Sequence, residues 1–255
     1  MAGRARPRLR VIHRRVLVGV ARDVTEATAR RSALVLAPHP DDETIACGAT
    51  IARKVATGAT VRVVVATDGG DELRRVECLE ACRRLGLQDH DVTFLGLPDG
   101  NLAAHADALD TALRSMLDTF VPEEVFAPSV IDAHPDHRSL AASVDRLRAD
   151  VLGKTQVLAY PVWFWNRWAW VDRATPRWLQ TAQLAWRPLK YALSVRTRVV
   201  RVAPFADLKA HALAAHRSQI DESFADPGQN VLDPDWLAMF MGTEELFFVV
   251  HRAAF

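Results

Sequence analysis

The feature that most constrains the fold is a regular alternation of short apolar runs and longer amphipathic stretches. Five runs are expected to be strands, at residues 32–37, 60–67, 91–97, 123–129 and 155–160. The stretches between them have apolar residues at helical spacing, at residues 43–58, 72–86, 108–120 and 138–152. This alternation is typical of βαβ units. We therefore expect an α/β fold with an open, mostly parallel sheet and helices on both of its faces.

The two ends of the chain do not follow this pattern. Residues 1–31 contain nine Arg and two acidic residues, and we expect a basic N-terminal segment there, a solvated arm or helix; the alternative is contact with an anionic membrane surface or an acidic partner. Residues 32–255 are expected to form one domain. Six of the seven Trp lie between residues 163 and 186, so residues 160–200 are expected to form an irregular Trp- and Arg-rich cap or insertion. A helix at 205–220 and a strand at 245–252 complete the expected elements.

Composition narrows the class of protein. A net charge of +1 and a hydrophobic content of 49% are those of an ordinary globular chain and give no reason to expect a nucleic-acid partner. No run reaches the ~18–20 apolar residues of a membrane span, and the apolar run at 16–21 is shorter than a signal sequence of about 7–15 apolar residues requires. Three sparse cysteines are not a disulfide framework. We therefore expect a cytoplasmic protein.

Two clusters of titratable residues follow expected strands. "HPDDE" (39–43) comes after the first strand and "DAHPDH" (132–137) after the fourth. In a parallel sheet both clusters would meet at one edge and bring together His39, Asp41, Asp42, His134, Asp136 and His137. One such cluster could be a simple turn, because Pro and Asp are common turn residues. Two together favour a divalent metal such as zinc, since close carboxylates repel one another without a cation.

"PHPDDE" followed about ninety residues later by "HPDH" resembles the LmbE-like, or PIG-L, family of zinc-dependent N-acetylglucosaminyl deacetylases. "ATDGG" (66–70), "LRRVE" (73–77), "LGLPDGNL" (95–102) and "LKAHALAAHRSQI" (208–220) strengthen the resemblance. It implies a Rossmann-like fold without a dinucleotide. The sequence agrees, because no G-x-G-x-x-G follows the first strand, and this also disfavours a nucleotide-binding protein.

The resemblance also implies roles for the two clusters. The zinc ligands would be His39, Asp42 and His137, and another divalent metal is the alternative. Asp41 would be the general base that takes a proton from the attacking water. His134 would stabilise the oxyanion and help to protonate the leaving amine, and Asp136 would orient His134.

Four further residues are candidates for binding the substrate. Arg74 would face the site from its helix; the alternatives are a surface ion pair with Glu77 or Glu80, or Arg75 in its place. Asp99, in "LPDGN", could bind sugar hydroxyls or serve only in a turn. Thr67 and Asp68 follow the end of a strand and could line the pocket. Near these residues, Glu43 is expected to support a helix N-terminus, and His216 to be a structural or rim residue.

Together these features predict a metal-dependent hydrolase that removes acetyl from an N-acetylated amino sugar in a glycoside or glycolipid. The alternatives are hydrolysis of another N-acyl or amide conjugate at the same site, or a catalytically silent metal- or sugar-binding protein. The Trp-rich segment has three interpretations: burial against the sheet, a stacking platform for sugar rings or an aromatic group, and peripheral contact with a membrane.

Overall fold

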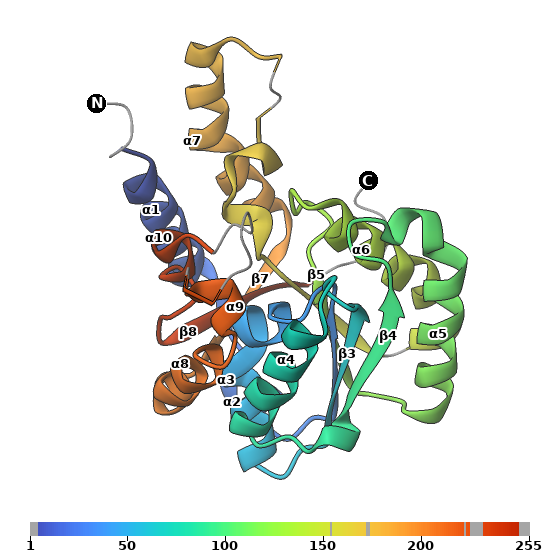
Figure 1. Cartoon of the computed structure of the whole chain (residues 1–255). Coiled ribbons are helices and arrows are strands. Elements are labelled where there is room, and N and C mark those ends of the chain that lie inside the picture. The colour runs from blue at the N-terminus through green and yellow to red at the C-terminus, as the bar shows by residue number, and fades with distance from the viewer. Residues whose placement is uncertain (1–4, 154, 172–173, 222, 225–231, 250–255) are drawn as a thin grey trace.

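All five strands expected between residues 32 and 160 lie in one eight-stranded sheet, ordered β1–β7–β8–β6–β5–β2–β3–β4 (Figure 1). The computed structural model describes residues 5–153, 155–171, 174–221, 223–224 and 232–249. The strands are β1 (Arg22–Asp23), β2 (Ala33–Ala37), β3 (Val61–Thr67), β4 (Val92–Leu97), β5 (Glu124–Pro128), β6 (Gln156–Tyr160), β7 (Arg196–Arg201) and β8 (Glu244–Val249). The last three residues of the expected strand at 245–252 lie outside the described residues.

The sheet is mostly parallel, as expected. Strands β2 to β6 pair in parallel, and β8 lies antiparallel between β6 and β7. Neither β7 nor β1 was expected as a strand. Because β1 pairs with β7, the sheet includes two residues of the basic N-terminal segment.

Helices cover both faces of the sheet. The α-helices are α1 (Ala5–Val20), α2 (Thr25–Thr28), α3 (Asp42–Ala56), α4 (Glu72–Arg84), α5 (Ala106–Thr119), α6 (Pro135–Leu147), α7 (Arg177–Ser194), α8 (Ala206–Leu213), α9 (Arg217–Ile220) and α10 (Pro234–Leu237). Alternate residues of β2 serve the two cores, as strand geometry requires. Val35 packs in the core that α3, α4 and α8 cover, and Leu36 in the core under α5 and α6.

The Trp-rich segment differs most from expectation. In place of an irregular cap, its second half is the 18-residue helix α7, which contains Pro188 and projects from the body of the molecule (Figure 1). A proline inside a helix removes one backbone hydrogen bond, so the sequence disfavoured a helix there. The expected helix at 205–220 is two short helices, α8 and α9. The expected helix at 138–152 begins earlier, at Pro135, and continues after α6 as a π-helical turn, Arg148–Leu152.

Two buried ion pairs hold elements to the sheet. At the start of β5, Lys54 Nζ lies 2.7 Å from Glu124 Oε2 and also donates to the carbonyl oxygens of Thr28 and Arg31. Near β8, Lys209 Nζ lies 2.7 Å from Glu245 Oε1. In each pair a buried lysine neutralises a buried carboxylate, and Arg31 also lies 3.5 Å from Glu124.

The order of the strands places a crevice beside β2. From β2 the chain builds β3 and β4 on one side, then crosses to β5 and β6 on the other. In open α/β sheets, ligands bind where the strand order reverses in this way, outside the carboxyl ends of the strands. None of the helices in the described part of the chain combines the length and apolar character needed to cross a membrane.

Candidate active site

The two clusters meet at the carboxyl ends of β2 and β5. His39 follows β2, while His134 and His137 lie at the start of α6, and the three imidazole rings are 4.7–5.5 Å apart between centroids. Pro135 occupies the first turn of α6, where its missing N–H costs no hydrogen bond. The sheet therefore brings together residues that are about a hundred positions apart in the sequence.

Asp42 is the centre of this arrangement. Its Oδ2 lies 3.2 Å from His39 Nδ1 and 3.2 Å from His137 Nε2, and it accepts the backbone N–H of His39 at 3.1 Å. Burial acts to raise the pKa of Asp42, but His137 and His39 outweigh it and hold that pKa well below its usual range. Asp42 is thus an ionised carboxylate in a buried corner.

These residues fit a divalent metal. Tetrahedral zinc with bonds of about 2.0–2.1 Å to nitrogen and oxygen separates its ligand atoms by about 3.3–3.4 Å, close to the spacing around Asp42. The buried Nε2 of His137 makes no hydrogen bond to any described residue, although Asp42 lies beside it. The nearest ring nitrogens of His39, His134 and His137 also lie within 4.8 Å of one another. A buried nitrogen without a hydrogen-bond partner that faces a carboxylate fits a bound cation.

A buried aspartate that was given no role in the sequence analysis fixes the ring of His137. Asp132 Oδ2 lies 3.0 Å from His137 Nδ1 and accepts the backbone N–H groups of Val162 and Trp163. Such a contact leaves the other ring nitrogen to face a metal. Burial acts to lower the pKa of His137, but Asp42 and Asp132 outweigh it and raise it to about 9. The only sequence signal was the position of Asp132 as the first residue of "DAHPDH".

Asp41 points away from Asp42, toward Arg74. Among the described residues Asp41 is the one non-glycine with a positive φ, 150°, a strained conformation. Its backbone N–H donates to Glu43 Oε2 at 3.0 Å, and its Oδ2 lies 3.3 Å from an Arg74 nitrogen. Burial and the charge of Asp42 raise the pKa of Asp41 to about 6, against the opposing effect of Arg74. The turn therefore directs adjacent carboxylates to different partners.

Glu43 supports the N-terminus of α3, as expected, from the first turn of that helix. Glu43 is fully buried, and its Oε1 lies 3.4 Å from His216 Nε2 while its Oε2 holds the backbone of Asp41. His216 is itself fully buried, which makes it a structural residue and not a rim residue.

His134 and Asp136 contact each other through the backbone. The Asp136 N–H donates to His134 Nδ1 at 3.3 Å, so the proton of a neutral His134 ring resides on Nε2. The carboxylate of Asp136 lies elsewhere than expected, because it accepts the N–H groups of Gly100 and Leu102 and contacts His39 Nε2 at 3.2 Å. Burial, with His39 and His137 nearby, lowers the pKa of His134 to about 4.

Of the four expected substrate-binding residues, the structure brings two to the site. Arg74 lies between Asp41 and Asp99, and Asp99 Oδ1 is 3.1 Å from His39 Nε2. Thr67 is buried and donates to the carbonyl oxygen of Pro38, whereas Asp68 is exposed and accepts the N–H of Gly70 within a turn. The helix phase favours Arg74 over Arg75, whose guanidinium lies over the ring of Phe94.

A cavity of about 210 Å³ opens beside His39, Asp41, Asp42 and His134. One wall is a pair of stacked indoles, Trp163 and Trp236, with ring centroids 4.8 Å apart. Gln219 and Leu232 line the cavity as well. None of these four was predicted as a site residue. Trp163 belongs to the Trp-rich segment, for which the sequence left three interpretations open. The other three residues come from the C-terminal part of the chain, where no motif marks them.

Comparison with known proteins agrees with this geometry. Residues 34–147 match the PIG-L family profile, described as GlcNAc-PI de-N-acetylase. A 1D-myo-inositol 2-acetamido-2-deoxy-alpha-D-glucopyranoside deacetylase of Mycobacterium sp. (strain JLS) is 29% identical, with 84% of this chain and 82% of that protein covered. The protein of the same name from Acidothermus cellulolyticus is also 29% identical, over 74% of this chain and 80% of its own length.

Solved structures share the fold. The N,N'-diacetylchitobiose deacetylase of Pyrococcus horikoshii superposes with a TM-score of 0.59 at 22% identity, covering 96% of this chain and 94% of its own. The deacetylase of the A40926 pseudoaglycone superposes with a TM-score of 0.64 at 17% identity, covering 89% and 99%. Both motif clusters that assemble at the sheet edge lie within the residues that match the PIG-L family profile, so residues 34–147 are similar to this family.

Proposed function

We propose that the protein is a metal-dependent hydrolase that removes the acetyl group from an N-acetylated amino sugar and releases acetate and a free amine. The observation that carries the proposal is that a ring nitrogen of His39 and one of His137 each lie 3.2 Å from Asp42 Oδ2, with Asp41 lining the same cavity. In this proposal the enzyme works in the cytoplasm, in solution or at the inner face of a membrane. Residues 32–255 act as one catalytic domain.

The donor set of two imidazoles and one carboxylate suits zinc, with other divalent ions as alternatives. When bound, such an ion polarises the acetyl carbonyl and makes a neighbouring water more acidic. His39, Asp42 and His137 would hold it. Asp132 keeps the Nε2 of His137 directed toward the ion.

Asp41 is the general base in this proposal. A carboxylate whose pKa is about 6 is largely ionised at neutral pH yet still basic enough to accept a proton. It takes the proton from water as the water oxygen bonds to the acyl carbon. It then returns this proton to the amide nitrogen, and the C–N bond breaks. Arg74 holds the carboxylate in place and favours its charged form.

His134 stabilises the oxyanion in its neutral form. Its pKa of about 4 means that it carries one ring proton at neutral pH, and the Asp136 N–H keeps that proton on Nε2. A neutral imidazole donates a hydrogen bond to the developing oxyanion but is a poor proton source. His134 was expected to help protonate the leaving amine. In this proposal Asp41, and not His134, delivers that proton.

The aromatic wall supports a sugar substrate. The apolar face of a sugar ring can pack on Trp163, and the buried indole N–H of Trp236 has no hydrogen-bond partner among the described residues. A sugar hydroxyl would satisfy it. Asp99 and Arg74 offer further polar contacts at the opposite side of the cavity.

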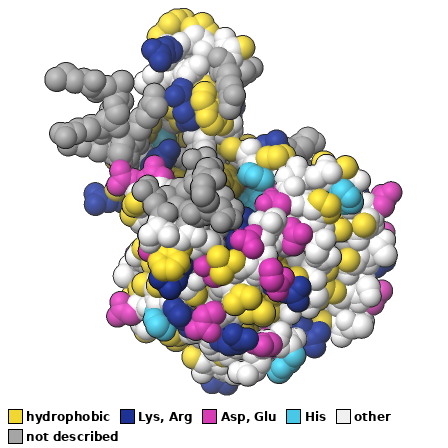
Figure 2. Space-filling model, in the orientation of Figure 1, with side chains coloured by type: hydrophobic (Ala, Val, Ile, Leu, Met, Phe, Trp, Pro, Cys, Tyr) yellow, Lys and Arg dark blue, Asp and Glu magenta, His cyan; other side chains and the backbone are white. Residues whose placement is uncertain are grey.

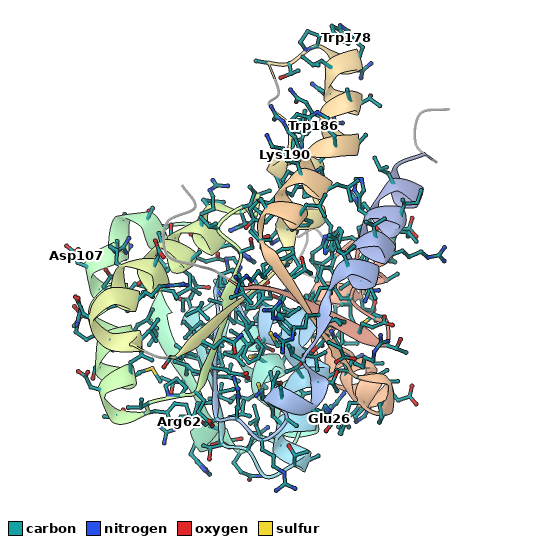
Figure 3. All side chains as sticks on the ribbon, turned by 180° about the vertical axis from the view of Figure 1, so that it is seen from behind. Glu26, Arg62, Asp107, Trp178, Trp186 and Lys190 are labelled. Carbon is teal, nitrogen blue, oxygen red and sulfur yellow. The ribbon has the colours of Figure 1, made fainter. Side chains whose placement is uncertain are left out.

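The test is release of free amine from a panel of N-acetylglucosaminides with inositol, lipid-linked and glycopeptide aglycones. Zinc-loaded wild type is compared with Asp41→Asn and with Asp107→Asn, an exposed residue of α5 that lies at the outer edge of the molecule (Figure 3) and does not line the cavity. Turnover should fall by about 10²–10⁴-fold in Asp41→Asn, with bound metal unchanged. Asp107→Asn should match wild type.

Two outcomes would overturn the proposal. If the metal-loaded protein deacetylates no member of the panel but hydrolyses other N-acyl amides, the sugar is wrong and the reaction class stands. If it binds metal and sugar without turnover of any amide, the chain is a binding protein.

A further inference from the structure

The helix α1 exposes an apolar face. Val11, Ile12, Val16 and Val20 are all exposed, and their spacing places them on one side of the helix together with Arg15. The opposite side carries the buried residues His13 and Leu17. A helix that covers a core normally directs its aliphatic residues inward, so this outward stripe needs another explanation.

The helix α7 exposes a second apolar face. Trp178 is 75% exposed, Trp186 47% and Leu193 71%, and the three residues share one side of the helix. Lys190 Nζ lies 5.3 Å from the centre of the Trp186 ring, so a cation accompanies the aromatic surface. Eight of the thirteen large hydrophobic side chains found exposed among the described residues lie on α1 or between Trp168 and Leu193.

The charge of these elements has one sign. Together α1 and α7 contain eight Arg or Lys and no Asp or Glu. In the sequence, residues 1–22 and 173–206 have no acidic residue at all, although the whole chain is nearly neutral. A surface that combines exposed Trp and aliphatic side chains with unbalanced positive charge matches the interface of a membrane that contains anionic lipid.

The two helices form one projecting unit. They contact each other where His13 Nε2 meets the carbonyl oxygen of Ala185 at 3.1 Å. Their N-terminal ends rise from the same side of the body in both ribbon views, with Trp178 at the tip of α7 (Figures 1 and 3). Hydrophobic and basic side chains appear together on this projection (Figure 2).

We propose that α1 and α7 form a docking surface for an anionic membrane, into whose headgroup region Trp178 and Trp186 insert. The Arg and Lys residues attract the surface, and the indoles and aliphatic side chains supply the apolar contact. The chain from η4 (Trp163–Trp165) to α7 links this surface to the wall of the candidate site, since Trp163 lines the cavity.

The test is partition of the full chain onto vesicles, which needs no turnover and so is independent of the proposed deacetylation. Vesicles of phosphatidylcholine alone are compared with vesicles that also contain phosphatidylglycerol. The variants are the double substitution W178S/W186S and the control Val121→Ser, since Val121 is 76% exposed at the other end of the molecule, before β5. Circular dichroism checks that each variant is folded.

Wild type and Val121→Ser should bind the anionic vesicles, and W178S/W186S should bind at least about tenfold more weakly. High salt should weaken binding. Brominated lipids should quench part of the Trp fluorescence of wild type, and this part should vanish in W178S/W186S. Equal partition of wild type and W178S/W186S, or no binding of wild type to anionic vesicles, would overturn the proposal. So would a wild-type dimer in light scattering that W178S/W186S converts to monomer, because the face would then bind a second copy.

Discussion

Buried charge is handled differently in two regions of the molecule. At the N-terminal edge of the sheet, the carboxylate of Glu124 pairs with Lys54 at 2.7 Å and more loosely with Arg31 at 3.5 Å, and further hydrogen bonds satisfy Lys54. At the opposite edge, five carboxylates gather around three histidines and one permanent cation, Arg74. These carboxylates are Asp41, Asp42, Asp99, Asp132 and Asp136.

The difference separates structural charge from functional charge. A balanced pair is complete within the protein, so its removal should affect stability and leave the chemistry alone. An unbalanced cluster with an unsatisfied buried nitrogen is complete only with a cation, so its removal should affect chemistry first. The number of charges alone would not distinguish the two regions, but the balance of their signs does.

The largest effect is expected from Asp42→Ala. This change removes the carboxylate between His39 and His137, and both metal content and kcat/KM should fall, the latter by about 10⁴-fold. The free energy of unfolding of the metal-free protein should change far less than in the variant of Lys54 below. Elemental analysis, steady-state kinetics and urea unfolding measure the three quantities. Retained metal and activity in Asp42→Ala would contradict the proposed ligand set.

The second largest effect is a loss of folding stability without a loss of catalytic activity. Lys54→Met leaves the buried Glu124 with the half-exposed Arg31, 3.5 Å away, as its remaining cation, and unfolding should require about 3–5 kcal/mol less free energy. Activity per folded molecule should stay near that of wild type. Adding Glu124→Gln should recover much of the loss, because no unpaired charge then remains. A large fall in kcat for Lys54→Met at full folding would show that the two regions are not independent.

The smallest effect is expected from a change to Asp132, which contacts the proposed ligand His137. Asp132→Asn keeps the shape of the side chain but replaces the carboxylate that faces His137 Nδ1. Metal affinity or kcat/KM should fall by about 10–100-fold, as is usual for residues that support a ligand. Competitive metal titration separates affinity from turnover. An unchanged affinity together with an unchanged kcat would mean that the backbone N–H groups alone fix this loop.

Local sequence patterns predicted the centre of the fold but not its edge. Strands β2 to β6 are short apolar runs separated by amphipathic helices, so their existence and parallel pairing followed from periodicity. Half of the residues of strand β7, "RTRVVR", are Arg, so no apolar run marks it in the sequence, and β8 and β1 provide its partners. The helix α7 contains Pro188, and its contact with α1 overrides the low helix propensity of that position.

The candidate site also has a part that the sequence predicted and a part that it did not. The motifs placed His39, Asp42, His134 and His137 correctly in one corner, because strand ends fix them. Contacts that depend on side-chain direction were not predictable, and the carboxylate of Asp136 turned to Gly100 and Leu102 instead of toward His134. Trp236 reaches the cavity from nearly a hundred residues beyond the second motif, a distance over which no local pattern carries information.

The strand β8 has a consequence for the order of folding. Its residue Glu245 accepts the backbone N–H groups of Ala49 and Thr50, in the middle of the helix that begins at Asp42. Glu245, almost two hundred residues further along the chain, thus stabilises the helix that carries the proposed ligand Asp42. During synthesis the parallel strands can pair long before β8 emerges, whereas this long-range contact must wait. Strands β2 to β6 should therefore become protected from hydrogen exchange before the proposed metal-binding corner reaches its final geometry.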